Sequence, residues 1–357
     1  MIESLRATDS DSVSRGNHVT DRSFDSPAID EGLASHFFAE LVRRHTLARR
    51  RLTAEREGLL DWARRLLPGH FRLPPSKMHR RLAALLEQAT FRRGARLNVL
   101  GPRGSAKSTV ASLAYPLWAM LEHGEPYVWL VSDTQHQARA HLETIRNELE
   151  TNAALRAIYS DLIDTMRASA GRIVLAGRTI EAYGTGQRIR GKRRLRHRPT
   201  LIIADDVQND EHMLSPRLRA KSRDWFFGSL VAAGTPETNI VHLATALHHQ
   251  ALGLELTRTP GWHSETFRAL LREPESQHLW ARWRAIYTNA DDPRAAEKAR
   301  RFYRQHRAEM DRGAEVLWPE REDLYTLMCL AAEIGPAAFA REKQNRPASP
   351  EACEWPD

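Results

Sequence analysis

The strongest constraint on the fold of this chain is an alternation of short apolar runs with longer helical stretches between residues 96 and 247. The runs are RLNVLG, YVWLVS, RIVLAG, TIEAYG, TLIIAD and NIVHLAT. Continuous apolar strands separated by helices are typical of a parallel sheet that is buried on both faces. The sequence therefore predicts an α/β core of parallel strands flanked by helices.

The regions on either side of this core differ from it in composition. The first 30 residues are rich in Ser, Asp and Arg, which predicts disorder. Residues 36–52 and 78–91 carry apolar side chains three and four positions apart, so both predict helices. The segment LPGHFRLPPSK between them must be a loop because of its prolines and glycine. We expect a disordered tail (1–30), a helical N-terminal region (31–95), the α/β core (96–265), a helical lid or linker region (266–347) and a second tail (348–357).

Charge and cysteine content limit the setting in which the chain works. Its formal net charge is +8, mostly from arginine, and its isoelectric point is near 9.8, which suits a polyanionic partner. Two cysteines, Cys329 and Cys353, are too few for a disulfide framework and favour a reducing, cytosolic environment. The N-terminus is polar and no run of about 18 apolar residues occurs, so we expect neither a signal peptide nor a membrane-spanning helix.

The segment LGPRGSAKST, residues 100–109, follows an apolar strand and opens a helical run. It matches the phosphate-binding pattern G-x-x-x-x-G-K-[ST], except that alanine stands at the second glycine position. In this interpretation Lys107 contacts the β and γ phosphates of ATP, Ser108 ligates Mg²⁺, and backbone amides cradle the anion. The alternative is a strand-to-helix turn whose small residues only permit close packing. The predicted nucleotide-binding residues are Gly101, Arg103, Gly104, Ser105, Ala106, Lys107, Ser108 and Thr109.

The alanine at position 106 is the one departure from the pattern. Its methyl group is tolerable if the backbone keeps a negative φ, whereas a left-handed conformation costs about 1 kcal/mol. Gly104 supplies compensating freedom. The departure therefore weakens the prediction without removing it.

A second motif supports the first. The segment TLIIADD, residues 200–206, is an apolar strand that ends in two carboxylates, the composition of a Walker B strand. Asp205 is predicted to hold Mg²⁺ through water, and Asp206 stands where a base orients the attacking water, with Glu211 as the alternative base. Paired aspartates at a strand end can also be helix caps or turn residues. Together the two motifs predict a P-loop NTPase of the ASCE type.

Two further segments are candidates for coupling roles. Residues 184–199 are strongly basic and predict either a solvated loop, a contact with the DNA backbone, or an arginine, with Arg190 as the candidate, that acts on the γ-phosphate of a neighbouring subunit. Thr245 ends the strand NIVHLAT and is predicted to sense the γ-phosphate. A β-branched residue in a strand is equally well explained by propensity.

The ordered set of motifs resembles the ATPase half of the tailed-phage terminase large subunit over roughly residues 75–347. The matching segments are LGPRGSAKST, LIIADDVQNDEHMLSP, WFFGSLVAAGTPETNIVHLATALHH and IGPAAFAREKQNRP. In this family Arg103 falls where the loop often carries arginine, and Gln344 with Asn345 falls at the exit from the ATPase domain.

The resemblance implies an ATP- and Mg²⁺-dependent motor. It would act as a homo-oligomeric ring on the portal protein, with a small terminase subunit, and drive double-stranded DNA into a procapsid in the cytoplasm of a bacterial host. The family's usual C-terminal nuclease is not expected from this chain. A non-hydrolysing DNA or capsid adaptor, or a remnant of a terminase, is the alternative. A helicase is less favoured because no aromatic single-strand signature is evident.

Overall fold

The computed structural model describes residues 57–194 and 197–348. The predicted tail 1–30 and the predicted helix over 36–52 lie outside the described residues, as does nearly all of the second tail. The loop predicted over 67–77 is confirmed, because one helix ends at Leu66 and the next begins at Lys77.

An eight-stranded sheet forms the centre of the described chain, in the order β3-β4-β5-β2-β6-β7-β1-β8. From β5 to β8 every neighbouring pair is parallel, which confirms the predicted α/β class. Strand β7 lies between β1 and β6, so the carboxyl ends of the two motif-bearing strands flank it. The strands are β1 (Arg96–Leu100), β2 (Tyr127–Ser132), β3 (Arg167–Ser169), β4 (Arg172–Leu175), β5 (Arg178–Gly184), β6 (Leu201–Asp205), β7 (Asn239–Ala244) and β8 (His263–Thr266).

One edge of the sheet departs from the prediction. The run RIVLAG forms β4, which pairs antiparallel with β5 and with β3. Only Ala176 and Gly177 separate β4 from β5, and both have positive φ, +48° and +81°. Two residues with positive φ make a tight hairpin turn, whereas a parallel crossover needs a dozen residues or more. The expectation of parallel pairing was therefore wrong for this run.

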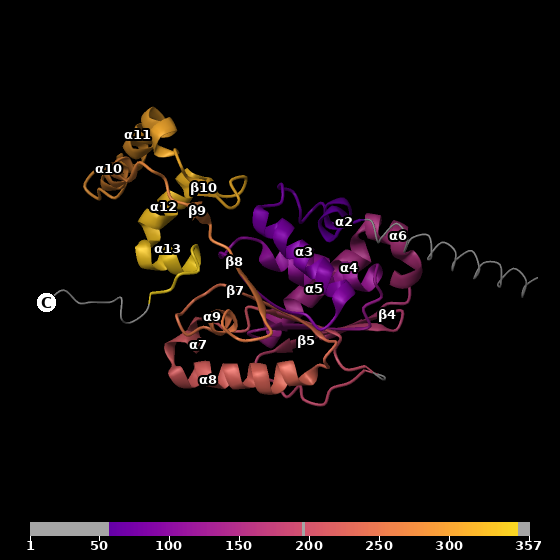
Figure 1. Ribbon diagram of the computed structural model, residues 1–357. Coiled ribbons are helices and arrows are strands. Elements are labelled where there is room, and N and C mark those ends of the chain that lie inside the picture. Colours follow the sequence, from indigo (N-terminus) through magenta and orange to yellow (C-terminus); the bar gives the residue numbers. More distant parts are fainter. Residues whose placement is uncertain (1–56, 195–196, 349–357) are drawn as a thin grey trace, which may run out of the picture. The chain divides into compact units, whose positions relative to one another are not determined.

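Helices cover both faces of the sheet, as Figure 1 shows, with α3, α4 and α5 on one face and α7 to α9 on the other. The first face carries α2 (Leu59–Leu66), α3 (Lys77–Arg92), the π-helix η1 (Thr109–Ala114), α4 (Tyr115–Leu121), α5 (Gln135–Thr151) and α6 (Ala153–Ile163). The second carries α7 (Asp210–Leu214), α8 (Pro216–Trp225), the π-helix η2 (Phe226–Leu230), the 3₁₀ turn η3 (Val231–Ala233) and α9 (Leu252–Leu256).

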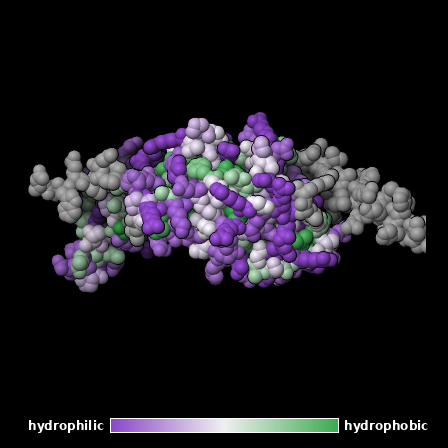
Figure 2. Space-filling model, turned by 90° about the horizontal axis from the view of Figure 1, so that it is seen from below, coloured by the Kyte–Doolittle hydropathy of each residue, from purple (hydrophilic) through white to green (hydrophobic). Residues whose placement is uncertain are grey.

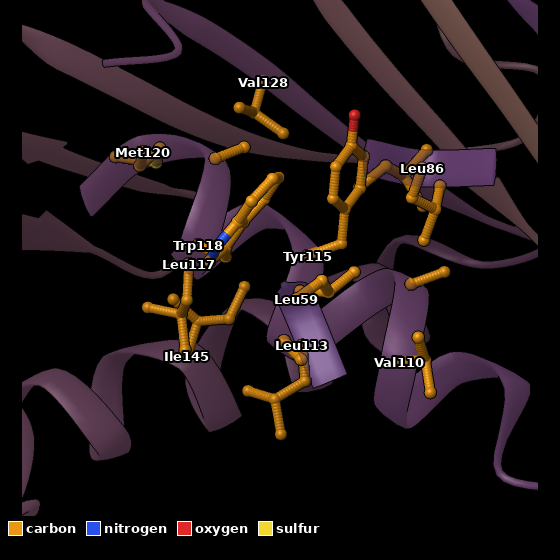
Figure 3. Close-up of a cluster of buried hydrophobic side chains, with 14 of the residues drawn as sticks. Leu59, Leu86, Val110, Leu113, Tyr115, Leu117, Trp118, Met120, Val128 and Ile145 are labelled. Carbon is orange, nitrogen blue, oxygen red and sulfur yellow. The ribbon is translucent and has the colours of Figure 1, made fainter. Parts of the chain in front are cut away.

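Two apolar clusters hold these layers together because successive strand residues face opposite sides. The larger cluster joins β1, β2, β6 and β7 to the first helical face, and Figure 3 shows Tyr115 and Trp118 in it beside Val128 of β2. The second cluster places Trp129 and Ile202 against Phe226 of η2. Burial on both faces explains why these strands read as continuous apolar runs.

The region after β8 is mostly helical and also contains a small antiparallel pair. Its own apolar cluster is centred on Trp280, Trp283 and Tyr303. Among the described residues, every helix is too short or too polar to span a lipid bilayer. The elements are β9 (Leu270–Arg272), α10 (Gln277–Tyr287), α11 (Ala295–Met310), β10 (Glu315–Val316), α12 (Leu324–Ile334) and α13 (Pro336–Glu342).

Candidate nucleotide-binding site

The loop between β1 and the helix that follows it has the conformation of an anion-binding turn. Gly104 and Ala106 both have positive φ, +81° and +57°. The chain turns helical at Lys107. Ala106 therefore adopts the left-handed conformation that glycine tolerates, and its methyl group costs about 1–2 kcal/mol there. Alanine would be free of strain here only with a negative φ, and that condition is not met.

Three carbonyl groups of this loop accept hydrogen bonds from side chains of other elements. Thr245 Oγ1 donates to the Gly101 carbonyl at 3.0 Å. Lys343 Nζ donates to the Arg103 carbonyl at 2.9 Å. His79 Nε2 lies 2.7 Å from the third acceptor, the carbonyl of residue 105.

These contacts fix the direction of two amides. In a trans peptide the N–H points opposite to the carbonyl of the preceding residue. The amides of Gly104 and Ala106 therefore point away from Lys343 and His79, and neither donates to any described residue. N–H groups without an acceptor just before a helix start are suited to binding phosphate oxygens.

Lys107 brings the ends of three strands together. Its side chain is buried, with Nζ 3.2 Å from Asp206 Oδ2 and 3.4 Å from Thr245 Oγ1. Burial raises the pKa of Asp206, and the positive charge of Lys107 opposes that rise. Asp206 itself has a left-handed backbone conformation, with a φ of +48°. The lysine and Asp206 thus occupy one site, as the two motifs require.

The Asp205 carboxylate lies close to two side chains that the motifs do not include. Its Oδ2 accepts a hydrogen bond from Ser112, one turn after Ser108, at 2.7 Å. His141 Nε2 lies 3.8 Å from the same oxygen. The other oxygen, Oδ1, is buried and has no partner among the described residues. A buried carboxylate oxygen without a partner fits a hard cation such as Mg²⁺, and Ser108, one turn before Ser112, is half-buried.

Residues of α13 and the segment after it contact the loop at Arg103. The backbone N–H of Arg103 donates to the Glu342 carbonyl at 2.9 Å, and Arg103 Nε pairs with the Glu342 carboxylate at 3.0 Å. Lys343 also pairs with Glu322 at 2.6 Å. Asn345 accepts from the backbone N–H of Ala246 at 2.8 Å. Arg103, predicted to contact the nucleotide, is thus bound by α13.

A cavity of about 420 Å³ lies beside the loop. Its wall includes His79, Gly104, Ala106 and Trp318, together with the turn over residues 69–73. His79 packs edge-on against Trp318, with 4.6 Å between the ring centroids, and its burial lowers its pKa. The positive charge on the cavity wall comes from Arg72 and Arg321, which also line it. The volume suits a nucleoside whose phosphates rest on the loop.

Sequence reasoning missed four residues of this site. Glu342 and Lys343 lie in the matched exit segment, but only Gln344 and Asn345 were singled out there. Ser112 is one helical turn after the predicted Ser108, a spacing that places both on one helix face. No signal in the sequence singles out His79.

Two predicted residues make no described contact with the loop. Arg190 is exposed, and its Nε donates to the Gly228 carbonyl of η2 at 2.8 Å. Glu211 is exposed on α7, where it adds to the effect of burial in raising the pKa of Asp133. Ser105 and Thr109 lie in the loop and its helix start, and the Ser105 hydroxyl is buried without a described partner.

No family model and no curated protein matches this chain. Among solved structures it is similar to a mutant ATPase domain of the large terminase of Thermus phage P74-26, with 10% identity and a TM-score of 0.41 over 77% of this chain and 100% of that one. It is also similar to the large terminase of bacteriophage HK97, with 14% identity and a TM-score of 0.39 over 69% of this chain and 50% of that one.

A third similar structure is the large terminase of a thermophilic bacteriophage in complex with ATP-gamma-S. Its identity is 15% and its TM-score 0.35, over 61% of this chain and 50% of that one. These likenesses concern the backbone fold and leave the chemistry to be argued from the chain's own residues.

Proposed function

We propose that this chain is the ATPase of a DNA-packaging motor, a terminase large subunit that hydrolyses ATP to drive double-stranded DNA into a viral procapsid. The observation that supports this most is the convergence of Lys107, Asp206 and Thr245 within hydrogen-bonding distance beside two unsatisfied loop amides. That combination of donors and one carboxylate is suited to binding a triphosphate and activating water.

In the proposed mechanism Lys107 exchanges Asp206 for phosphate oxygens when ATP enters. The amides of Gly104 and Ala106 hold the same phosphates, and Thr245 contacts both the lysine and the loop. Once the lysine leaves it, the Asp206 carboxylate is free to accept a proton from water, and its raised pKa suits that task. Glu211 stays the alternative base.

Ser108 and Asp205 would hold Mg²⁺, which when bound supplies charge neutralisation to the phosphates. Ser112 holds Oδ2 of the Asp205 carboxylate by a hydrogen bond. Because that bond occupies Oδ2, the partnerless Oδ1 is left available to the metal.

The remaining features of the proposal concern assembly. The active form would be a homo-oligomeric ring on the portal protein with a small terminase subunit, in the cytoplasm of a bacterial host, and Arg190 would act on a neighbour's γ-phosphate. We also propose the division into an N-terminal region to residue 95, an ATPase core over 96–265 and a lid or linker over 266–347.

ATPase assays with and without duplex DNA test this function. Lys107→Ala should lower the DNA-stimulated rate by about 100-fold or more, because the main positive charge at the phosphates is lost. Lys298→Ala, which removes an exposed lysine paired with Asp292 on α11, is the matched control and should retain the rate. Robust hydrolysis by the Lys107 variant would reject the assignment.

A second candidate is a nucleotide-binding adaptor that does not hydrolyse ATP. It is favoured by the strain at Ala106 and by an aspartate, one methylene shorter than glutamate, at the position of the base. Tight ATP binding without phosphate release in the presence of DNA would support the adaptor over the motor.

A further inference from the structure

Four cations on the side of the molecule that carries α8 are exposed and lack a partner among the described residues. Arg188 and Arg193 lie in the basic loop after β5, and Arg217 and Lys221 lie on α8. None of the four forms a hydrogen bond or ion pair with a described residue. We call this group the α8 face, and Figure 2, which views the molecule from below, shows much hydrophilic surface on that side.

The basic loop is held in place rather than left free in solvent. Ile189 is fully buried in the second apolar cluster. Arg190 Nε donates to the Gly228 carbonyl, and Arg194 Nε donates to Glu181 Oε1 at 2.8 Å. The loop therefore presents its remaining cations from a fixed base, which lowers the entropy that they lose on binding.

The anchor for Arg194 is a buried carboxylate that stays ionised. Burial alone would raise the pKa of Glu181, but hydrogen bonds from Tyr127, Tyr183 and Arg194 lower it. The anchor is therefore charged at neutral pH and holds the arginine by a charge-assisted bond.

Helix α8 continues the same surface. Trp225 at its end donates from Nε1 to the Gln187 carbonyl at 2.9 Å, which ties the helix to the basic loop. Arg223 pairs with Glu255 on α9 and also lies near Asp224. Arg217 and Lys221 are one turn apart, so they lie on one face of the helix.

A comparison with α11 shows why the α8 face is distinct. Helix α11 is also rich in arginine, but two of its four exposed arginines are neutralised on the helix itself: Arg301 pairs with Glu297 and Arg307 pairs with Asp311, each one turn away. Cations neutralised by their own helix attract a polyanion weakly. The free cations of the α8 face have no such internal partner among the described residues.

We propose that the α8 face binds the phosphate backbone of duplex DNA. The inference rests on the proposed function only for the identity of the polyanion. The ten residues of α8 extend about 15 Å, which matches about four phosphates along one strand of B-form DNA. Contacts of this kind carry no base readout, so binding should be independent of sequence and sensitive to salt.

The test measures binding of the full chain to a fluorescent duplex of about 30 base pairs, by anisotropy over a range of salt concentrations. The variant carries Arg188→Gln, Arg193→Gln, Arg217→Gln and Lys221→Gln. The matched control removes four exposed arginines of α11 through Arg300→Gln, Arg301→Gln, Arg304→Gln and Arg307→Gln.

We expect the variant to reduce the log–log salt slope by about 3.6, which is four contacts at 0.9 each, and to weaken binding at least about tenfold near 100 mM salt. The control should stay close to the unmodified chain. An unchanged slope in the variant, an equal loss in the control, or equally tight binding of a single strand of the same length would overturn the proposal.

The ATPase rate without DNA separates this proposal from the proposed function. The variant should keep that rate, because none of its four positions lies in the nucleotide site. Loss of DNA binding by the variant with normal hydrolysis supports the surface. Normal DNA binding by the variant leaves the motor assignment standing and rejects this face.

Discussion

Replacing Ala106 by glycine should stabilise the protein. At a φ of +57° the methyl group of alanine costs about 1–2 kcal/mol, which glycine does not incur. Glycine also makes the unfolded chain more flexible, which costs about 0.4–1 kcal/mol. The difference leaves Ala106→Gly more stable by roughly 0.5–1 kcal/mol, equivalent to an increase in Tm of about 1 °C for a chain of this size.

Equilibrium unfolding in urea provides the assay, with two matched alanine-to-glycine controls. Ala176 has a φ of +48° in the β4–β5 turn, so Ala176→Gly should shift stability in the same direction. Ala140 is exposed within α5, so Ala140→Gly should destabilise the protein by about 1 kcal/mol. If Ala106→Gly destabilises as much as Ala140→Gly, the left-handed conformation of the loop is refuted.

Three other changes test contacts around the sheet. His242 is fully buried, and burial lowers its pKa to about 4, so between about pH 6.5 and 4 the unfolded chain binds a proton that the folded chain does not bind. The free energy of unfolding should therefore fall by about 3 kcal/mol as the pH decreases across that window. His242→Gln should flatten the dependence of the unfolding free energy on pH in the same window. Glu181→Gln weakens the hydrogen bond from Arg194 and should lower the free energy of unfolding in urea by about 1.5–3 kcal/mol. The basic loop should also be cleaved faster by protease, and an unchanged cleavage rate would show that Glu181 does not order the loop. Ser112→Ala removes the hydrogen-bond donor to Asp205 and should raise the Mg²⁺ concentration that gives half-maximal hydrolysis by about tenfold. An unchanged concentration would show that Ser112 does not position Asp205 for the metal.

The sequence reveals most of the sheet because its strands are buried on both faces. Strands β1, β2, β6 and β7 coincide with apolar runs for that reason. The antiparallel edge could also have been predicted, since the two residues Ala176 and Gly177 leave no room for a crossover. The order of the strands in the sheet, in contrast, could not be predicted from the sequence. No local feature of the segment NIVHLAT predicts that this strand pairs with both β1 and β6.

The site was predictable where it depends on short spacing and not where it depends on distant partners. Lys107 and Asp206 are identified by motifs whose flanks are visible in sequence. The contact of Arg103 with Glu342 joins segments more than two hundred residues apart, and no periodicity encodes it. The conformation of Ala106 likewise depends on tertiary contacts, because the local preference of alanine is for negative φ.

Those tertiary contacts explain why the strain at Ala106 persists. A residue keeps an unfavourable backbone angle only where its surroundings determine the conformation more strongly than its own preference. Here Thr245, Lys343 and His79 each bind a loop carbonyl, at alternate residues 101, 103 and 105. Reversing the peptide before Ala106 to relieve its φ would break the His79 bond and turn an amide away from the anion site. The side chains that hold the carbonyls therefore also aim the amides, and the loop keeps its binding geometry without the glycine that the pattern requires.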